Sequence, residues 1–222
     1  SCRSVGFKTK IIDSNAENLS NEDILKRLID LKPKILCLVV YGQNVNAGTA
    51  NMRGAVDITN FLKNNKVPFP IAFIGSHVQA LPIETLKKEK NIDMVFTNEG
   101  VYALRNLLKL NNFVPDELVN IKGIAYRNNG EIKMNLPEKV VPTEKMDQDL
   151  PGYAWDLLPF KNKPLDLYRS PMWHAEYDFN QRSPYASIQT SLGCVFKCDF
   201  CMINLINRND SDEIGVAGKY SN

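Results

Sequence analysis

The sequence predicts an α/β fold with a doubly wound parallel sheet of the Rossmann-like or flavodoxin-like kind. Short apolar runs of strand length alternate with stretches of helical period in four successive strand-then-helix units. One of the runs, residues 35–41 (ILCLVVY), is apolar throughout. An unbroken apolar run is typical of a parallel strand that is covered on both faces by helices, and repeated strand–helix units build such a sheet.

The expected elements follow one another along residues 7–110. Residues 7–12 alternate in part like a strand, and Ser20 then precedes a helix with Ile24 and Leu28 on its apolar face, which Pro33 ends. The strand at residues 35–41 comes next. The remaining elements are predicted in order as a helix at 51–64, a strand at 71–74, a helix at 83–88, a strand at 94–97 and a helix at 101–110.

The pattern changes after residue 110. Two short runs, 122–126 and 131–134, are joined through Asn128-Asn129-Gly130, which indicates a hairpin because Asn and Gly tolerate positive φ. We expect this hairpin to close a first domain at residues 1–141. Residues 142–183, rich in proline and aromatic side chains, are interpreted as an ordered linker. A second domain starts at residues 184–222, with a strand at 185–190 directly before a cysteine-rich segment.

Composition and charge exclude several classes of partner. Lys plus Arg number 27 and Asp plus Glu number 25, so the formal net charge is only +2. The signs are interspersed, and no basic surface for nucleic acid is indicated. The longest strongly apolar run is far shorter than the roughly 20 residues of a membrane span, and no signal peptide opens the sequence. A cytoplasmic location is therefore expected.

Three of the five cysteines form a compact motif. Cys194, Cys198 and Cys201 stand at C-x-x-x-C-x-x-C within TSLGCVFKCDFCMIN. Three thiolates on one loop can each hold one iron of a 4Fe-4S cluster and leave the fourth iron open to a chelating substrate. The alternatives are a structural zinc site, with His174 or a distant group as fourth ligand, and unrelated buried thiols.

Polar side chains fill the loops expected at the carboxyl ends of the strands, where open parallel sheets bind ligands. The loops are residues 13–18, 42–49, 75–80 and 97–100. Their amides, hydroxyls and single histidine suit hydrogen bonding to a large polar ligand better than acid–base chemistry, although loops are commonly polar for no functional reason. G-x-G-x-x-G and G-x-x-x-x-G-K-[ST] are both absent, which disfavours dinucleotide and P-loop sites.

The cysteine loop resembles the cluster-binding motif of radical S-adenosylmethionine (radical SAM) enzymes. The rest of the chain is similar to the subgroup that carries an N-terminal cobalamin-binding domain. The motifs behind the resemblance are FIGSHVQALPIETL (73–86), DMVFTNEGVYAL (93–104), AWDLLPF (154–160) and YASIQTSLGC (185–194).

The resemblance implies a set of cofactors and ligands. Cys194, Cys198 and Cys201 would hold a 4Fe-4S cluster that reductively cleaves S-adenosylmethionine to a 5′-deoxyadenosyl radical, with flavodoxin or ferredoxin as electron donor. Cobalamin would lie across the carboxyl edge of the sheet. Its expected contacts are Gln43, Asn44, Asn46, Thr49, Gly75, Ser76, His77 and Gln79.

The implied reaction is methyl transfer to an unactivated carbon or phosphorus of a small-molecule or peptide substrate, and no residue is assigned as catalytic. The D-x-H-x-x-G signature is absent, so no imidazole is expected on cobalt, although His77 is the one histidine of the first domain. Val195 stands where the family often has proline. The alternative is a non-catalytic cobalamin- or nucleotide-binding module whose cysteine loop senses redox state or holds zinc.

The two ends of the sequence lead us to expect a fragment. Ser1 opens the chain, and Cys2 to Gly6 is typical of a helix tail with a C-terminal glycine, so the first strand of the cobalamin domain would be missing. Residues 184–222 would supply only the first strand and cluster loop of a truncated radical SAM (β/α) barrel. We therefore expect the 222-residue chain to be inactive by itself.

Overall fold

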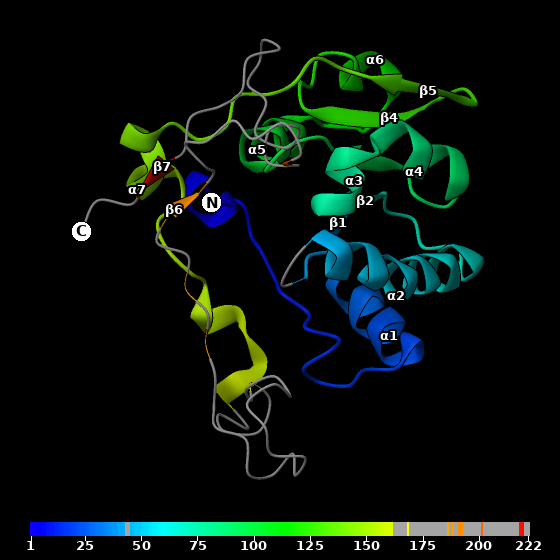
Figure 1. Cartoon of the computed structure of the whole chain (residues 1–222). Coiled ribbons are helices and arrows are strands. Elements are labelled where there is room, and N and C mark those ends of the chain that lie inside the picture. The colour runs from blue at the N-terminus through cyan, green and yellow to red at the C-terminus, as the bar shows by residue number, and fades with distance from the viewer. Residues whose placement is uncertain are drawn as a thin grey trace.

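The computed structural model describes residues 1–42, 45–161, 168, 186, 188, 191–192, 201 and 218–219. Within these residues the main sheet has the strand order β1-β2-β3-β4-β5 (Figure 1). The parallel strands are β1 (Leu36–Val39), β2 (Ile71–Ile74) and β3 (Met94–Phe96). The antiparallel strands β4 (Ile124–Asn128) and β5 (Glu131–Met134) continue the sheet from β3. The sheet is therefore mixed, not purely parallel as predicted.

Helices cover both faces of this sheet, as expected for a doubly wound fold. The main helices are α1 (Asn21–Leu31), α2 (Val45–Asn64), α3 (Ser76–Ala80), α4 (Pro82–Lys88), α5 (Val101–Lys109) and α6 (Pro115–Leu118). One core joins side chains of α1, α2 and α4, such as Leu28, Leu62 and Leu86, to Phe73 of β2. A second core joins Leu107 of α5 and Leu118 of α6 to the other face.

Local sequence signals account for several element ends. Ser20 Oγ accepts a hydrogen bond from the Asp23 N–H at 3.1 Å, and the Asp23 carboxylate accepts one from the Ser20 N–H at 3.2 Å. This capping box begins α1, and the helix ends at Leu31, two residues before Pro33. The predicted hairpin is confirmed, because Asn129 and Gly130 both have positive φ between β4 and β5.

Two strand predictions are wrong. Residues 7–12 form no strand, because alternation of apolar residues is a local pattern whereas a ladder needs a partner strand, and β1 pairs with β2 alone among the described residues. β1 is consequently an edge strand, half-buried, with Val39 67% exposed, so it is not covered on both faces. The apolar run predicted burial that the sheet order does not provide.

The helix predictions hold with shifted boundaries. The helix expected at 51–64 begins at Val45, and the helix expected at 101–110 spans Val101–Lys109. The loop expected at 75–80 contains the short helix α3, followed directly by α4. Helix boundaries are the least local part of such predictions, since packing decides whether the first turn forms.

The segment after β5 lies against the first domain through ion pairs and hydrogen bonds. It contains η2 (Thr143–Lys145), α7 (Met146–Asp149), η3 (Trp155–Leu157) and η4 (Pro159–Lys161). Arg105 of α5 pairs with Asp149 at 2.7 Å. Arg3 in η1 (Cys2–Val5), which ends at Gly6 with φ 90°, pairs with Asp156 at 2.6 Å. These contacts bring the linker alongside the N-terminal segment.

Residues 184–222, where we predict the start of a second domain, are described in part. The residue pairs Ser191–Leu192 (β6) and Gly218–Lys219 (β7) form a two-stranded antiparallel sheet. The strand predicted at 185–190 lies outside the described residues, except for positions 186 and 188. None of the described helices combines the length and apolar character that crossing a membrane requires.

Candidate functional site

The carboxyl ends of β1 and β2 approach each other through glycine. Gly75, directly after β2, has φ 152°, and a Cβ at this position would lie 2.0 Å from the carbonyl oxygen of Val40. A Cβ on Gly48 would lie 2.3 Å from Ser76 Oγ. No larger residue permits these approaches without movement of its neighbours. The two glycines therefore bring the start of α2 against α3.

This approach joins two predicted ligand residues. Thr49 Oγ1 of α2 and His77 Nδ1 of α3 lie 3.1 Å apart, at hydrogen-bond distance. Burial lowers the pKa of His77, and the positive charge of Lys88 lowers it further. A neutral imidazole is thus favoured at this edge. Asn46 is exposed one helical turn before Thr49, so the two side chains share a face of α2.

Buried polar atoms at the same edge have no partner in the described part of the chain. They are Ser76 Oγ, Gln79 Oε1 and Thr97 Oγ1. Ser76 is 7% exposed and Gln79 is 5% exposed. Buried polar groups in folded proteins are nearly always paired, and an unpaired one costs about 1–3 kcal/mol. Among the described residues, Ser1 Oγ and Arg105 Nε are the other two such atoms, so three of the five lie at this edge, which makes it a candidate site for a polar ligand.

The orientation of the Gln79 amide follows from its neighbours. Its Nε2 donates to the carbonyl oxygen of Asn98 and to the hydroxyl of Tyr41, the latter at 3.0 Å. A carbonyl oxygen can only accept, so Nε2 has to face Asn98 and Oε1 has to face away. The unpaired Oε1 needs an N–H or O–H donor. Tyr41 contributes here although the sequence placed it at the end of a strand, and burial raises the pKa of its hydroxyl.

The loop after β3 connects the edge to the segment between β5 and the linker. Asn98 Oδ1 accepts from the Gly100 N–H at 3.0 Å, and Asn98 Nδ2 donates to the carbonyl of Glu138 at 2.7 Å. Glu99 Oε1 accepts from the Val141 N–H at 2.5 Å. Burial raises the pKa of the Glu99 carboxyl, opposed by that hydrogen bond. The sequence predicted a ligand loop here and missed its second role, because the partners lie about 40 residues away.

The structure thus brings together five of the eight predicted cobalamin contacts and places a sixth, Asn46, next to them. The five are Thr49, Gly75, Ser76, His77 and Gln79. Gln43 and Asn44 lie outside the described residues. The glycines and unpaired acceptors suit a broad ligand rich in N–H donors. The carboxamide-bearing rim of cobalamin fits this set.

The cysteines divide into two groups. Cys201 is half-buried, while Cys194 and Cys198 lie outside the described residues. Within the described ranges, no three His, Cys, Asp or Glu side chains come together as a metal site. Burial raises the pKa of Cys37 to about 12, so its thiol stays protonated, as expected of a small core residue. The assignment of Cys194, Cys198 and Cys201 as cluster ligands stays a prediction from the sequence.

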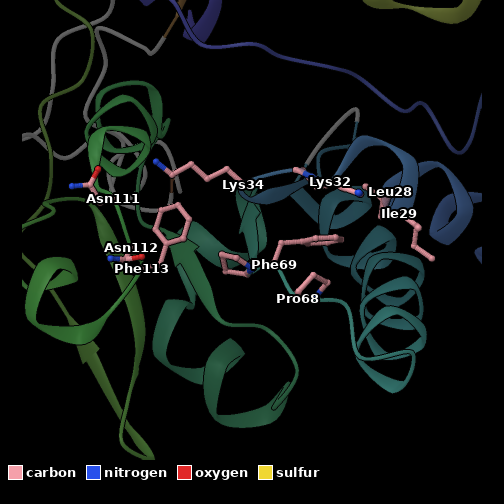
Figure 2. A pocket seen from close by; sticks show the side chains of 11 residues that line it. Leu28, Ile29, Lys32, Lys34, Pro68, Phe69, Asn111, Asn112 and Phe113 are labelled. Carbon is pink, nitrogen blue, oxygen red and sulfur yellow. The ribbon is translucent and has the colours of Figure 1, made fainter.

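A cavity of about 520 Å³ lies at the opposite, amino end of the strands (Figure 2). Its lining is mainly apolar and includes Phe69, Phe113 and Pro68. The Lys34 ammonium at its margin already donates to the carbonyl of Leu108 at 2.9 Å and lies over the Phe113 ring. This hollow lacks the unpaired polar groups of the carboxyl edge.

Comparison with known proteins agrees with this picture of the fold. No protein-family model matches the chain. It is 28% identical over 196 residues to an uncharacterised methyltransferase of Pyrococcus horikoshii, covering 88% of this chain and 37% of that protein. It is 26% identical over 205 residues to the hopanoid C-3 methylase of Methylococcus capsulatus, covering 90% of this chain and 33% of that protein. The chain thus spans about a third of these relatives.

Solved structures of the radical S-adenosylmethionine methyltransferase TsrM from Kitasatospora setae share the fold. One, with tryptophan and an S-adenosylmethionine analogue bound, matches with a TM-score of 0.57 at 13% identity, over 99% of this chain and 38% of that one. Another, with cobalamin and a [4Fe-4S] cluster bound, matches with a TM-score of 0.57 at 12% identity, over 99% and 39%. At this identity the likeness establishes the mixed α/β fold.

Proposed function

We propose that this chain is the N-terminal part of a cobalamin-dependent radical SAM methyltransferase. The observation that carries the proposal is the set of buried, unpaired acceptors at the carboxyl edge, in a chain that also contains the C-x-x-x-C-x-x-C motif. Both curated relatives are named as methyl-transferring proteins, which favours this activity over other radical chemistry. The acceptor of the methyl group is an unactivated carbon or phosphorus in a small molecule or peptide.

Cobalamin would be held by hydrogen bonds to residues of α2, α3 and the loop after β3. Gln79 Oε1 would accept from a carboxamide N–H of the ligand, and Ser76 Oγ and Thr97 Oγ1 would each gain a partner. When bound, cobalamin supplies a cobalt centre that can carry a methyl group. The absence of D-x-H-x-x-G favours binding without a protein imidazole on the metal.

Cys194, Cys198 and Cys201 would hold the 4Fe-4S cluster as thiolates. When bound, the cluster would supply one-electron reduction of S-adenosylmethionine, with a protein such as flavodoxin or ferredoxin as the electron donor. The rest of the polypeptide would orient the two cofactors and exclude water and oxygen. Residues that position S-adenosylmethionine and the methyl acceptor would belong to a barrel beyond the part described.

Cobalamin binding tests the first half of this proposal. Hydroxocobalamin should co-elute with the protein in gel filtration, and its absorption spectrum should shift. Gln79→Met, at nearly constant volume, removes the unpaired acceptor together with the two hydrogen bonds of Nε2 to Tyr41 and Asn98, and should weaken binding about tenfold or more, the cost of at least one hydrogen bond of roughly 1.4 kcal/mol. Gln148→Met, on an exposed linker residue, is the matched control and should bind as the wild type does. Equal weakening by both variants, or no binding at all, would contradict the proposal.

Anaerobic reconstitution tests the second half. Iron and acid-labile sulfide should reach about four atoms each per chain, and Ala at Cys194, Cys198 or Cys201 should abolish the visible absorption. Cys37→Ala provides the control, because that cysteine belongs to β1 and not to the C-x-x-x-C-x-x-C motif. Stoichiometric zinc without labile sulfide would instead favour a zinc-stapled binding module.

A further inference from the structure

A continuous series of hydrogen bonds crosses the carboxyl edge and ends at Glu138, in the segment between β5 and the linker. It begins at the Tyr41 hydroxyl after β1, which accepts from Gln79 Nε2 at 3.0 Å. The same Nε2 donates to the main-chain carbonyl of Asn98 after β3. The Asn98 side chain then donates from Nδ2 to the carbonyl of Glu138 at 2.7 Å. Three elements of the sheet edge are thereby joined to the segment that follows β5.

The Asn98 side chain has little freedom to move independently of its backbone. The residue is 1% exposed, and its Oδ1 is held by the Gly100 N–H at 3.0 Å. Gly100 has φ 75°, and a Cβ there would lie 2.5 Å from the side chain of Ile74, so the turn is closely packed. A shift of the main-chain carbonyl of Asn98 therefore moves its side-chain amide as well.

Glu99, next to Asn98 in sequence, binds the segment between β5 and the linker at a second point. Glu99 Oε1 accepts from the Val141 N–H, three residues beyond Glu138. Farther along, Asp149 pairs with the buried Arg105. Consecutive loop residues thus hold consecutive points of the segment that leads toward the cysteine loop.

We propose that Asn98 is a positioning residue that couples ligand binding at the carboxyl edge to residues 138–141, the segment directly before the linker. The naming of cobalamin as that ligand rests on the proposed function. A donor on the ligand that bonds to Gln79 Oε1 fixes the rigid amide plane, whose Nε2 then holds the Asn98 carbonyl more firmly. Asn98 Nδ2 transmits this order to Glu138, and Glu99 extends it to Val141. Because thermodynamic coupling is reciprocal, order in residues 138–141 also favours ligand binding.

Hydrogen exchange at the Val141 amide measures the coupling. Hydroxocobalamin at saturation should slow this exchange about fivefold or more in the 222-residue chain, the lower end of common coupling strengths. Asn98→Asp should abolish the slowing. The aspartate can still accept from the Gly100 N–H but cannot donate to the Glu138 carbonyl. Asn98→Ser, whose side chain is too short to reach Glu138, provides a second variant should the aspartate prevent folding.

Asn135→Asp is the matched control. Asn135 Nδ2 donates to the carbonyls of Leu118 and Ile121 at 2.8 and 2.7 Å, outside the series of hydrogen bonds that runs through Gln79 and Asn98. Its replacement loses similar hydrogen bonds, and ligand-induced slowing at Val141 should persist. Loss of slowing in this control would attribute the effect to general stability and overturn the role of Asn98. Cobalamin that binds the wild type without slowing Val141 overturns the coupling alone, whereas failure to bind overturns the proposed function as well.

Discussion

The two ends of the parallel strands differ in whether their buried polar groups have partners. At the amino end, the Asp93 carboxylate before β3 accepts from the Ile71 N–H at 2.7 Å and from the Lys63 ammonium at 2.6 Å. At the carboxyl end, Ser76 Oγ and Gln79 Oε1 are buried and unpaired within the described residues. Satisfied groups add stability, whereas unpaired ones reduce it. This difference is expected if the amino end contributes to folding stability and the carboxyl end takes part in the proposed ligand binding.

The presence of a cavity does not by itself distinguish the proposed ligand-binding end of the strands from the other end. The cavity of Figure 2 lies at the amino end, yet none of the buried unpaired atoms found among the described residues belongs to its lining. Lys34 there donates to main-chain carbonyls at the end of α5. Substitutions at the two ends should therefore separate stability from ligand affinity, and four of them test this from the largest effect to the smallest.

Gly75→Ala should have the largest effect. The new Cβ would meet the Val40 carbonyl oxygen at 2.0 Å, and the backbone at φ 152° disfavours any side chain. We expect a loss of about 3–4 kcal/mol in the free energy of unfolding, measured by urea denaturation. The control is Gly54→Ala, in the exposed middle of α2 with no atom within 4 Å of the new Cβ, which should stabilise by about 0.5–1 kcal/mol. Similar effects at both sites would contradict the proposed close approach.

Arg127→Met should destabilise the amino end without changing the site. The guanidinium donates to the carbonyls of Ile92 and Glu89 at 3.0 and 2.9 Å, and to that of Leu86. Methionine keeps the apolar stem and loses these bonds, so we expect a loss of about 2–3 kcal/mol in the same assay. Cobalamin affinity, measured at a temperature where the variant is folded, should stay within twofold of the wild type. A tenfold weaker affinity would show that the two ends are not separable.

Ser76→Ala should do the opposite at the carboxyl end. Removal of a buried hydroxyl without a partner should raise the free energy of unfolding by about 1 kcal/mol and weaken cobalamin binding severalfold. Ser4→Ala is the matched comparison, because the Ser4 hydroxyl donates to the Ser1 carbonyl at 2.8 Å and accepts from Arg105 at 3.0 Å. That variant should lose stability and leave binding unchanged. Thermal unfolding with and without cobalamin distinguishes the two.

Glu99→Gln should show the smallest effect, visible through its pH dependence. Burial raises the folded-state pKa of Glu99 above its unfolded value. The protonated carboxyl therefore contributes its full share to the free energy of unfolding below the unfolded pKa, and this share is lost as the pH rises through the folded pKa. Glutamine keeps the acceptor for the Val141 N–H and carries no charge. The variant should melt at a higher temperature than the wild type at pH 8 and at the same temperature at pH 4. An equal difference at both pH values would exclude this origin.

Several features of the molecule were predictable from short stretches of sequence. Ser20 and Asp23 close a capping box within four residues, and Asn129 and Gly130 form the hairpin turn because both adopt positive φ. In both cases the interacting groups are close in sequence, so the pattern contains the interaction. The polar loops after the strands and the cysteine motif also led to a predicted ligand site and a predicted cluster site, and these stay predictions.

Other features depend on partners distant in sequence, and only the tertiary structure decided them. Residues 7–12 have a strand-like pattern but no ladder, and the apolar run around β1 lies at an edge, because pairing depends on which strands become neighbours. The same holds at the site. Gln79 reaches Tyr41 across 38 positions, and Asn98 reaches Glu138 across 40. The sequence by itself determined the residue types available for binding, whereas packing determined which of their atoms remained unpaired, because hydrogen bonding is settled only when distant segments meet.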